Sequence, residues 1–247
     1  MNPDAPDQRS LTLWQHLEEL RKRMLVSLAA LAVVTVVGYI YSDFLLSILL
    51  RPVTGELKEL YFFSPAEAFL VRLKVALLAG AVAAFPLVAA EAWFFVSPGL
   101  YAREKKLILP VVLGISLLFT AGVVFCYHGV VPAAIRFFLG LQSDVLRPLI
   151  SVREYVDFLT QLLTAFGVAF NLPVFVMAFV FAGLTDAKRL NKLRRHAVVL
   201  IFIAAAALTP GPDVASQILL AVPLLVLFEL SIGAAFLVGI FRKRKKP

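Results

Sequence analysis

The sequence predicts an all-α integral membrane protein with six transmembrane helices, of which the last two are short. Hydrophobic residues make up 61% of the 247 residues and charged residues only 16%, whereas about half of an ordinary soluble domain is apolar. The apolar residues stand in blocks, most of them long enough to cross a hydrocarbon core. We expect a polar segment at 1–23, a single six-helix domain at 24–241 and a basic tail at 242–247.

The first three helices are expected at about 24–41, 66–96 and 107–128. The first run has 18 residues without a charge, which as a helix reaches about 27 Å. Before the second run, Ser64 and Pro65 fit the N-cap and the first helical position. That second helix exceeds the hydrocarbon thickness, so we expect it to tilt or protrude.

The last three helices are expected at about 157–184, 197–209 and 214–240. The first of these is interrupted by Asn171 and Pro173. Residues 197–208 reach only about 18 Å as a helix, too short for a hydrocarbon core of about 30 Å. Two short crossings in a locally thinned bilayer and a re-entrant hairpin both remain open, and we favour the crossings.

The segments between these runs are expected outside the membrane. The segment 42–67 reads as partly helical, and residues 131–141 as a short helix lying on the surface. Prolines and one aspartate are expected to shape turns and kinks; these residues are Pro52, Pro86, Pro98, Pro173, Pro210 and Asp213.

Basic residues predict the orientation of the chain. Of the 24 Lys and Arg residues, 17 fall on one side of the predicted topology. Because basic loops stay in the cytoplasm, both termini are expected there. The polar start and the long first apolar run do not fit a cleavable signal peptide.

The motifs of several function classes are missing from the sequence. No phosphate-binding loop, nucleophile elbow or spacing of metal ligands occurs, so we expect no enzyme, no cofactor and no metal site. Cys126 is a single cysteine, which leaves no internal disulfide. The net charge of +8 is explained by cytoplasmic loops, so we expect no nucleic-acid partner.

Carboxylates at the cytoplasmic border are the first candidate site. Glu18 and Glu19 precede the first apolar run, and Glu104 follows the second. A carboxylate receives an arginine guanidinium well, so these residues could hold a ligand with adjacent arginines. The alternative is that they form ion pairs with the basic residues at 21–23 and 105–106.

Polar side chains inside the apolar runs are the second candidate. Glu91, Asn171 and Glu229 lie within the second, fourth and sixth runs, where such groups are costly and mark function. Asn171 and Glu229 also suit polar contacts between helices. A small-solute secondary transporter with these three residues at a midplane site is the alternative function.

The chain resembles the TatC family of the twin-arginine translocase over nearly its whole length. Five motifs in order carry the resemblance: His16-Leu17-x-Glu19-Leu20-Arg21-x-Arg23, Ser64-Pro65-x-Glu67-x-Phe69, Pro86 with Trp93-x-Phe95-x-x-Pro98-Gly99-Leu100 and Glu104-Lys105-Lys106, Phe166-Gly167-x-x-Phe170-x-x-Pro173, and Leu208-Thr209-Pro210-x-Pro212-Asp213-x-x-Ser216-Gln217.

The resemblance implies a glove-shaped, concave bundle in the bacterial inner membrane that receives signal peptides with paired arginines. It also implies an oligomeric complex with single-span TatA-type and TatB-type proteins that moves folded proteins on the protonmotive force. Glu19 and Glu104 map onto the residues that contact the arginines, with Arg21 and Lys105 beside them. Asn171, Glu91 and Gln217 are expected to be polar contacts inside the membrane or with partners.

Two positions depart from the family pattern. The family usually has an acidic residue at position 171 and glutamine at position 91, where this chain has Asn171 and Glu91. An amide cannot take up a proton, which argues against a proton-linked role at position 171. We do not expect Glu91 to replace it, because the two positions lie at different depths.

Overall fold

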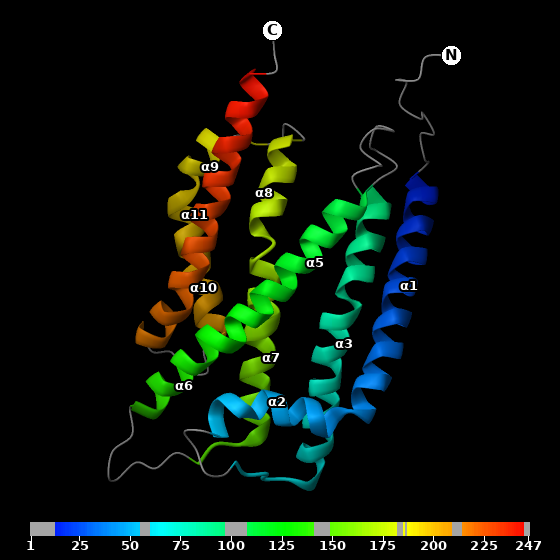
Figure 1. Ribbon diagram of the computed structural model, residues 1–247, viewed down its shortest axis with the longest axis vertical. Helices are drawn as coiled ribbons and strands as arrows, with labels where there is room; N and C mark the ends of the chain where they lie inside the picture. Colours follow the sequence, from blue (N-terminus) through cyan, green and yellow to red (C-terminus); the bar gives the residue numbers. More distant parts are fainter. Residues whose placement is uncertain are drawn as a thin grey trace. The chain divides into compact units, whose positions relative to one another are not determined.

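The computed structural model describes residues 13–54, 60–96, 108–140, 149–181, 185, 187–208 and 214–244, and these residues are almost all helical (Figure 1). The elements are α1 (Leu13–Ile40), α2 (Ser42–Thr54), α3 (Pro65–Val96), α5 (Ile108–Phe125), the π-helix η2 (Cys126–Val130), α6 (Val131–Gly140), α7 (Val152–Ala169), α8 (Leu172–Phe181), α9 (Ala187–Lys192), α10 (Arg194–Leu208) and α11 (Val214–Arg244).

The chain divides into two compact units. Unit 1 comprises residues 1–48 and 69–117, and unit 2 comprises residues 49–68 and 118–247. Unit 1 therefore holds α1 and most of α3, and unit 2 holds the elements from η2 to α11. The boundary passes through α2, α3 and α5, which contribute to both units.

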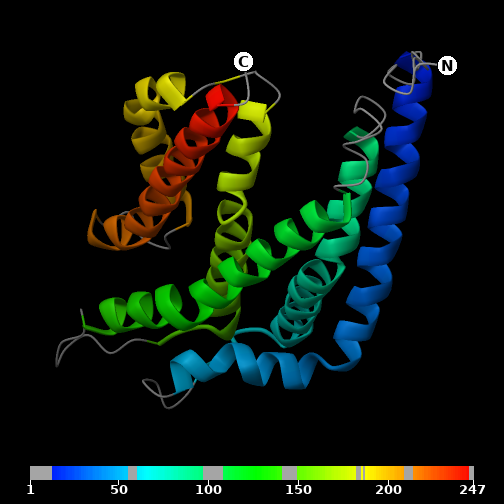
Figure 2. The ribbon, with the colours of Figure 1, turned by 45° about the horizontal axis from the view of Figure 1, so that its top comes forward.

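In unit 1, α1 and α3 lie side by side and run in opposite directions (Figures 1 and 2). A Cβ added at Gly38 would stand 3.1 Å from the carbonyl oxygen of Ala76, and one added at Gly80 would overlap the hydroxyl of Thr35. Small residues thus let the two backbones approach closely, as is common between membrane helices.

The first helix begins earlier than the sequence predicted. We expected it at Met24, but α1 starts at Leu13 and includes the whole charged stretch up to Arg23. The reason is tertiary: the polar turns of α1 lie against the last turns of α3, where His16 stacks on Phe95 with ring centroids 4.4 Å apart.

In unit 2, α7 supplies much of the core. Its buried face includes Val156, Leu159, Leu162 and Phe166, each with no exposed surface. α7 also crosses α5 at close range, since a Cβ at Gly122 would lie 2.5 Å from the carbonyl oxygen of Phe166.

The predicted surface helix is not separate from the third membrane helix. α5, η2 and α6 form one continuous helical run, and Leu109–Gly140 together are long and apolar enough to cross a membrane. The backbone N–H of Val131 donates to the carbonyl oxygen of Cys126, five residues earlier. This wider turn directly precedes Pro132, whose ring and missing N–H do not suit an uninterrupted α-helix.

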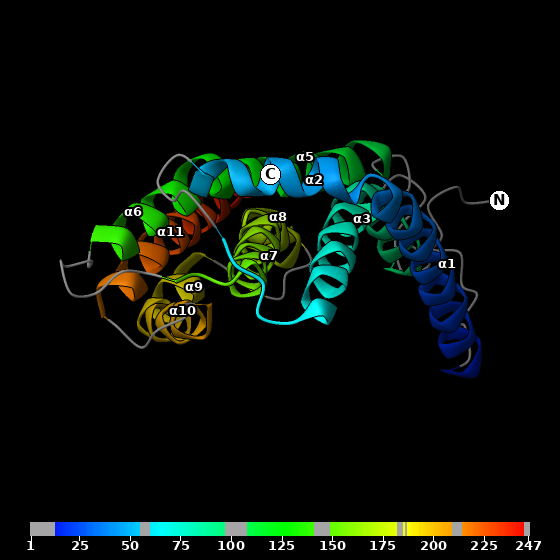
Figure 3. The same cartoon turned by 90° about the horizontal axis from the view of Figure 1, so that it is seen from below.

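The fourth membrane helix is broken where the sequence predicted. α7 ends at Ala169, and α8 begins at Leu172 and continues in the direction of α7 (Figure 3). Phe170 and Asn171 form the turn between them, and Pro173 follows one residue later, after Leu172.

Five helices in the described residues are long and apolar enough to span a membrane. α10 has only 15 residues, in keeping with a short fifth crossing, so a count of six crossings stays a prediction. α11 starts at the predicted residue but has 31 residues, because the helix continues into the basic tail as far as Arg244. It is therefore not short as a helix. It packs against α8 and α10.

Two connecting segments of unit 2 are joined by a polar cluster. Tyr61 and Ser151 form a parallel bridge, with N–H groups of Tyr61 and Val152 donating at 3.2 and 3.1 Å. The Ser151 hydroxyl donates to the buried Glu67 carboxylate, which also accepts the N–H of Phe63 at 2.7 Å. Glu67, in the first turn of α3, therefore also joins this segment to the one before α7, 84 residues away.

Candidate functional site

The candidate site of unit 1 lies where the first turns of α1 meet the last turns of α3. Arg23 of α1 donates from Nη2 and Nε to the same oxygen of Glu19, at 2.8 and 3.1 Å. Its Nη1 donates to Glu91 of α3 at 2.9 Å. Glu19 and Arg23 are four residues apart and so share one face of α1. One guanidinium therefore joins two carboxylates from different helices.

Two aromatic rings of α3 contact side chains in the first turns of α1. The guanidinium carbon of Arg23 lies 5.3 Å from the centre of the Phe94 ring, within range of a cation–π interaction. His16 stacks on Phe95, one residue further along α3. Phe94 and Phe95 thus both contact polar side chains of α1.

An open cavity of about 390 Å³ adjoins the cluster. Its lining is mainly charged, and the residues are Gln15, Glu18, Glu19, Lys22, Arg23, Val26 and Glu91. The three side chains of the ion-pair cluster keep 17–25% of their surface exposed. The cluster is therefore partly shielded but open to solvent on one side.

The predicted signal-binding residues lie in different parts of the chain. Glu19 belongs to the cluster, and Arg21 is exposed on α1. Glu104 and Lys105 lie outside the described residues, as do Pro98, Pro210 and Asp213. For Glu19 the structure has the ion pair that the sequence offered as the alternative.

Asn171 is buried at the break between α7 and α8, with 2% of its surface exposed. Its side-chain nitrogen donates to the carbonyl oxygen of Gly167 at 3.0 Å. Its side-chain oxygen has no hydrogen-bond partner among the described residues. The amide nitrogen of Asn171 therefore bonds to the last turn of α7, while its amide oxygen accepts no hydrogen bond from the described residues.

The other polar candidates make contacts within unit 2. Glu229 is half exposed and accepts from Arg194 at 2.6 Å, so it does not share the buried surroundings of Asn171. Gln217 donates to the carbonyl oxygen of Phe202 at 2.7 Å and joins α11 to α10.

Three of the predicted structural prolines fall within helices. Pro52 and Pro86 lie inside α2 and α3. Pro173 is the second residue of α8, a position in the first helical turn where its missing N–H costs no bond.

Sequence reasoning missed Arg23 as the centre of the cluster. The spacing of Glu19 and Arg23 was visible as a possible pair along a helix. The contact with Glu91, 68 residues away, was not, because it depends on how α1 and α3 align.

Comparison with known proteins identifies a family that this chain matches. Residues 15–223 match the family described as Sec-independent protein translocase protein (TatC). The chain is 41% identical over 229 residues to the Sec-independent protein translocase protein TatC of Carboxydothermus hydrogenoformans, across 93% of this chain and 94% of that protein. It is 34% identical to the TatC of Aquifex aeolicus, across 96% of this chain and 98% of that protein.

A solved structure is also similar. A crystal structure described as the twin arginine translocase receptor TatC superimposes with a TM-score of 0.82 at 34% sequence identity. The superposition covers 90% of this chain and 98% of that one.

Proposed function

Because the chain belongs to the TatC family of Sec-independent protein translocase proteins, we propose that it is the receptor component that binds signal peptides with paired arginines. Its relatives are named as protein translocase components, so it is a multi-pass membrane protein of a transport family and not an enzyme. The peptide's arginines are bound by Glu19 and Glu104, with Arg21 and Lys105 beside them.

One observation carries this proposal. The carboxylate of Glu19 already accepts two hydrogen bonds from a guanidinium, that of Arg23, at 2.8 and 3.1 Å. Charge-assisted bonds from a planar guanidinium favour arginine over lysine at such a site. The geometry is therefore suited to binding an arginine side chain at the border of the membrane.

The same proposal extends to partners and energy. Single-span TatA-type and TatB-type proteins bind the helices that carry Asn171, Glu91 and Gln217, and the assembled oligomer moves folded proteins on the protonmotive force. The membrane is the bacterial inner membrane, with both termini in the cytoplasm. The excess of basic residues on one side of the topology supports this orientation.

Peptide binding tests the proposal. The full chain in lipid nanodiscs is titrated with a labelled peptide that carries Arg-Arg before an apolar stretch, and with its Lys-Lys counterpart. Glu19→Ala and Glu104→Ala should each weaken binding of the Arg-Arg peptide by roughly tenfold or more, since a hydrogen bond to a charged group is lost. The Lys-Lys peptide should bind weakly throughout.

Glu154→Ala is the matched control, because Glu154 is an exposed carboxylate in the first turn of α7. It should leave binding of both peptides unchanged. If neither Glu19→Ala nor Glu104→Ala weakens binding of the Arg-Arg peptide, the recognition site is wrong.

A further inference from the structure

Resting on the receptor function proposed above, we propose that Arg23 is an internal ligand of the carboxylates of Glu19 and Glu91, which an arginine of the bound peptide displaces. Arg23 thus competes for these two carboxylates, and only a peptide that offers a guanidinium group replaces it well. Glu91 becomes a second carboxylate that selects for guanidinium groups.

The geometry of Arg23 is that of a bound ligand. Its guanidinium donates three hydrogen bonds to carboxylate oxygens, two to Glu19 and one to Glu91, at 2.8–3.1 Å. The guanidinium also lies over the ring of Phe94. A free arginine side chain would meet the same two carboxylates and the same aromatic ring.

The pairing is weak enough to be exchanged. About a quarter of the Arg23 side chain remains exposed, and its two partners are exposed to 23% and 17%. Ion pairs with such access to water are weak, because water screens the charges and competes for the hydrogen bonds. The open cavity beside the cluster also gives a peptide side chain a route to both carboxylates.

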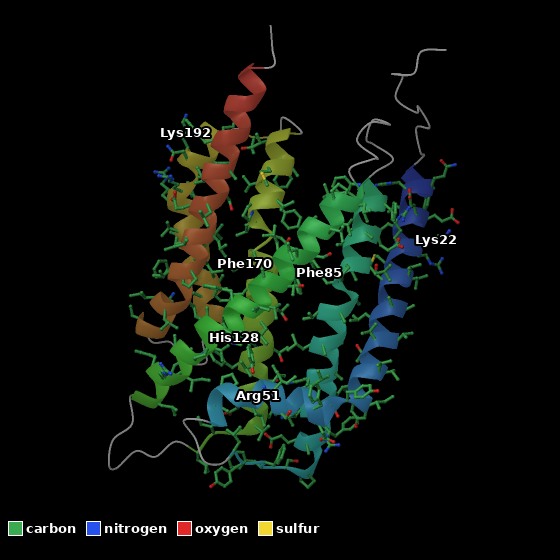
Figure 4. The ribbon with its side chains drawn as sticks, in the orientation of Figure 1. Lys22, Arg51, Phe85, His128, Phe170 and Lys192 are labelled. Atoms are coloured by element: carbon green, nitrogen blue, oxygen red, sulfur yellow. The ribbon has the colours of Figure 1, made fainter. Side chains whose placement is uncertain are left out.

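The charges also favour exchange with an arginine-rich peptide. When Arg23 turns away, Glu19 and Glu91 leave two negative charges at the site, which attract the peptide arginine that Glu19 binds. Glu18 and Lys22 also line the cavity with opposite charges, and the Lys22 side chain points outward from α1 (Figure 4). The rest of the lining is thus close to neutral.

The test uses association kinetics of the Arg-Arg peptide with the full chain in nanodiscs. If Arg23 must leave first, the observed association rate is the intrinsic rate multiplied by the fraction of chains in which Arg23 is displaced, while the dissociation rate is unaffected. Arg23→Gln should therefore speed association by about five- to twentyfold, as expected from two weak ion pairs. Dissociation should stay the same.

Arg72→Gln is the matched control. Arg72 forms an ion pair with Asp43 at 2.8 Å in the same unit, so this variant also removes one arginine and one ion pair. It should leave both rates unchanged. An unchanged or slower association of Arg23→Gln, or a change in its dissociation rate alone, would overturn the proposal.

Two further variants keep the test decisive. Arg23→Lys retains the charge but cannot span two carboxylates with a planar fork, so its association rate should lie between those of the native chain and Arg23→Gln. If Arg23→Gln does not fold, the association rate of Arg23→Lys tests the proposal instead, and a rate no faster than that of the native chain would overturn it. In the Glu91→Gln background, Arg23→Gln should give a smaller gain, because Arg23 is already held less firmly.

The outcomes separate this inference from the proposed function. If the native chain does not prefer the Arg-Arg peptide over the Lys-Lys peptide, the receptor function itself fails. If that preference is present but removing Arg23 does not speed association, the function stands and the internal-ligand inference is wrong.

Discussion

At the scale of single residues, Glu19 shows what sequence could and could not reveal. Its motif indicated a carboxylate for arginine, and the structure places it against a guanidinium. That this guanidinium belongs to Arg23, and that Glu91 shares it, depends on tertiary alignment. A side chain's own neighbours along a helix can be read from spacing, but its partner on another helix cannot.

Asn171 gives a prediction at this scale. Asn171→Leu removes the hydrogen bond to Gly167 together with the unpartnered side-chain oxygen, and should cost about 1 kcal/mol. Asn171→Asp should cost more, about 2–4 kcal/mol at neutral pH, because one carboxylate oxygen would face the carbonyl oxygen of Gly167 and the other has no donor among the described residues. The midpoint of thermal unfolding in detergent measures both. A more stable Asn171→Asp would show that the site supplies a donor.

At the scale of elements, the sequence predicted the break before Pro173 and the start of α3, because proline and capping residues act locally. It missed the continuity of α5 with α6. We expected the third helix to end at residue 128, but a π turn carries the helix on past Gly129 and Pro132. It also placed the start of α1 eleven residues late. The turns before Met24 are polar, and their packing on α3 cannot be predicted from local hydropathy.

The crossing of α5 and α7 gives a prediction about how helices pack. Gly122→Ala should destabilise the protein by about 1–3 kcal/mol, since its Cβ would stand 2.5 Å from a backbone oxygen that cannot turn aside. Gly114→Ala, on the same helix, meets nothing within 4 Å. It should leave stability unchanged or raise it slightly, as alanine favours helix.

Chemical unfolding of the two glycine variants side by side measures the difference. Because both variants make the same change on one helix, any common effect of helix propensity cancels. Equal unfolding free energies would mean that α5 and α7 are not in close contact at Gly122.

At the scale of the whole molecule, the family and the all-α membrane fold predicted from the sequence are confirmed. The sequence was informative here because membrane helices are long apolar runs and because the five motifs span nearly the whole chain. The orientation depends on charge alone and can be tested directly.

Labelling of single cysteines tests the orientation. With Cys126 replaced by serine, Phe62→Cys lies in the exposed segment before α3, and Lys192→Cys is exposed at the end of α9 (Figure 4). A membrane-impermeant maleimide should label Phe62→Cys in intact cells and Lys192→Cys only after lysis, since basic segments face the cytoplasm. The opposite pattern would invert the predicted topology.

The π turn at Cys126–Val130 also bears on how this chain tolerates insertions and deletions. A π turn accommodates one residue more than an α turn, so η2 has the form left by a single-residue insertion into an older α-helix. Deleting one residue there would restore a regular α-helix, and because the π turn holds the extra residue, α6 would keep its orientation about the helix axis. Val131, Ala134 and Ile135, now buried, would keep facing their neighbours. Deleting one residue from a regular turn of α5 would instead rotate everything after it by about 100°. A one-residue deletion is therefore expected to be tolerated better at η2 than elsewhere in this helical run.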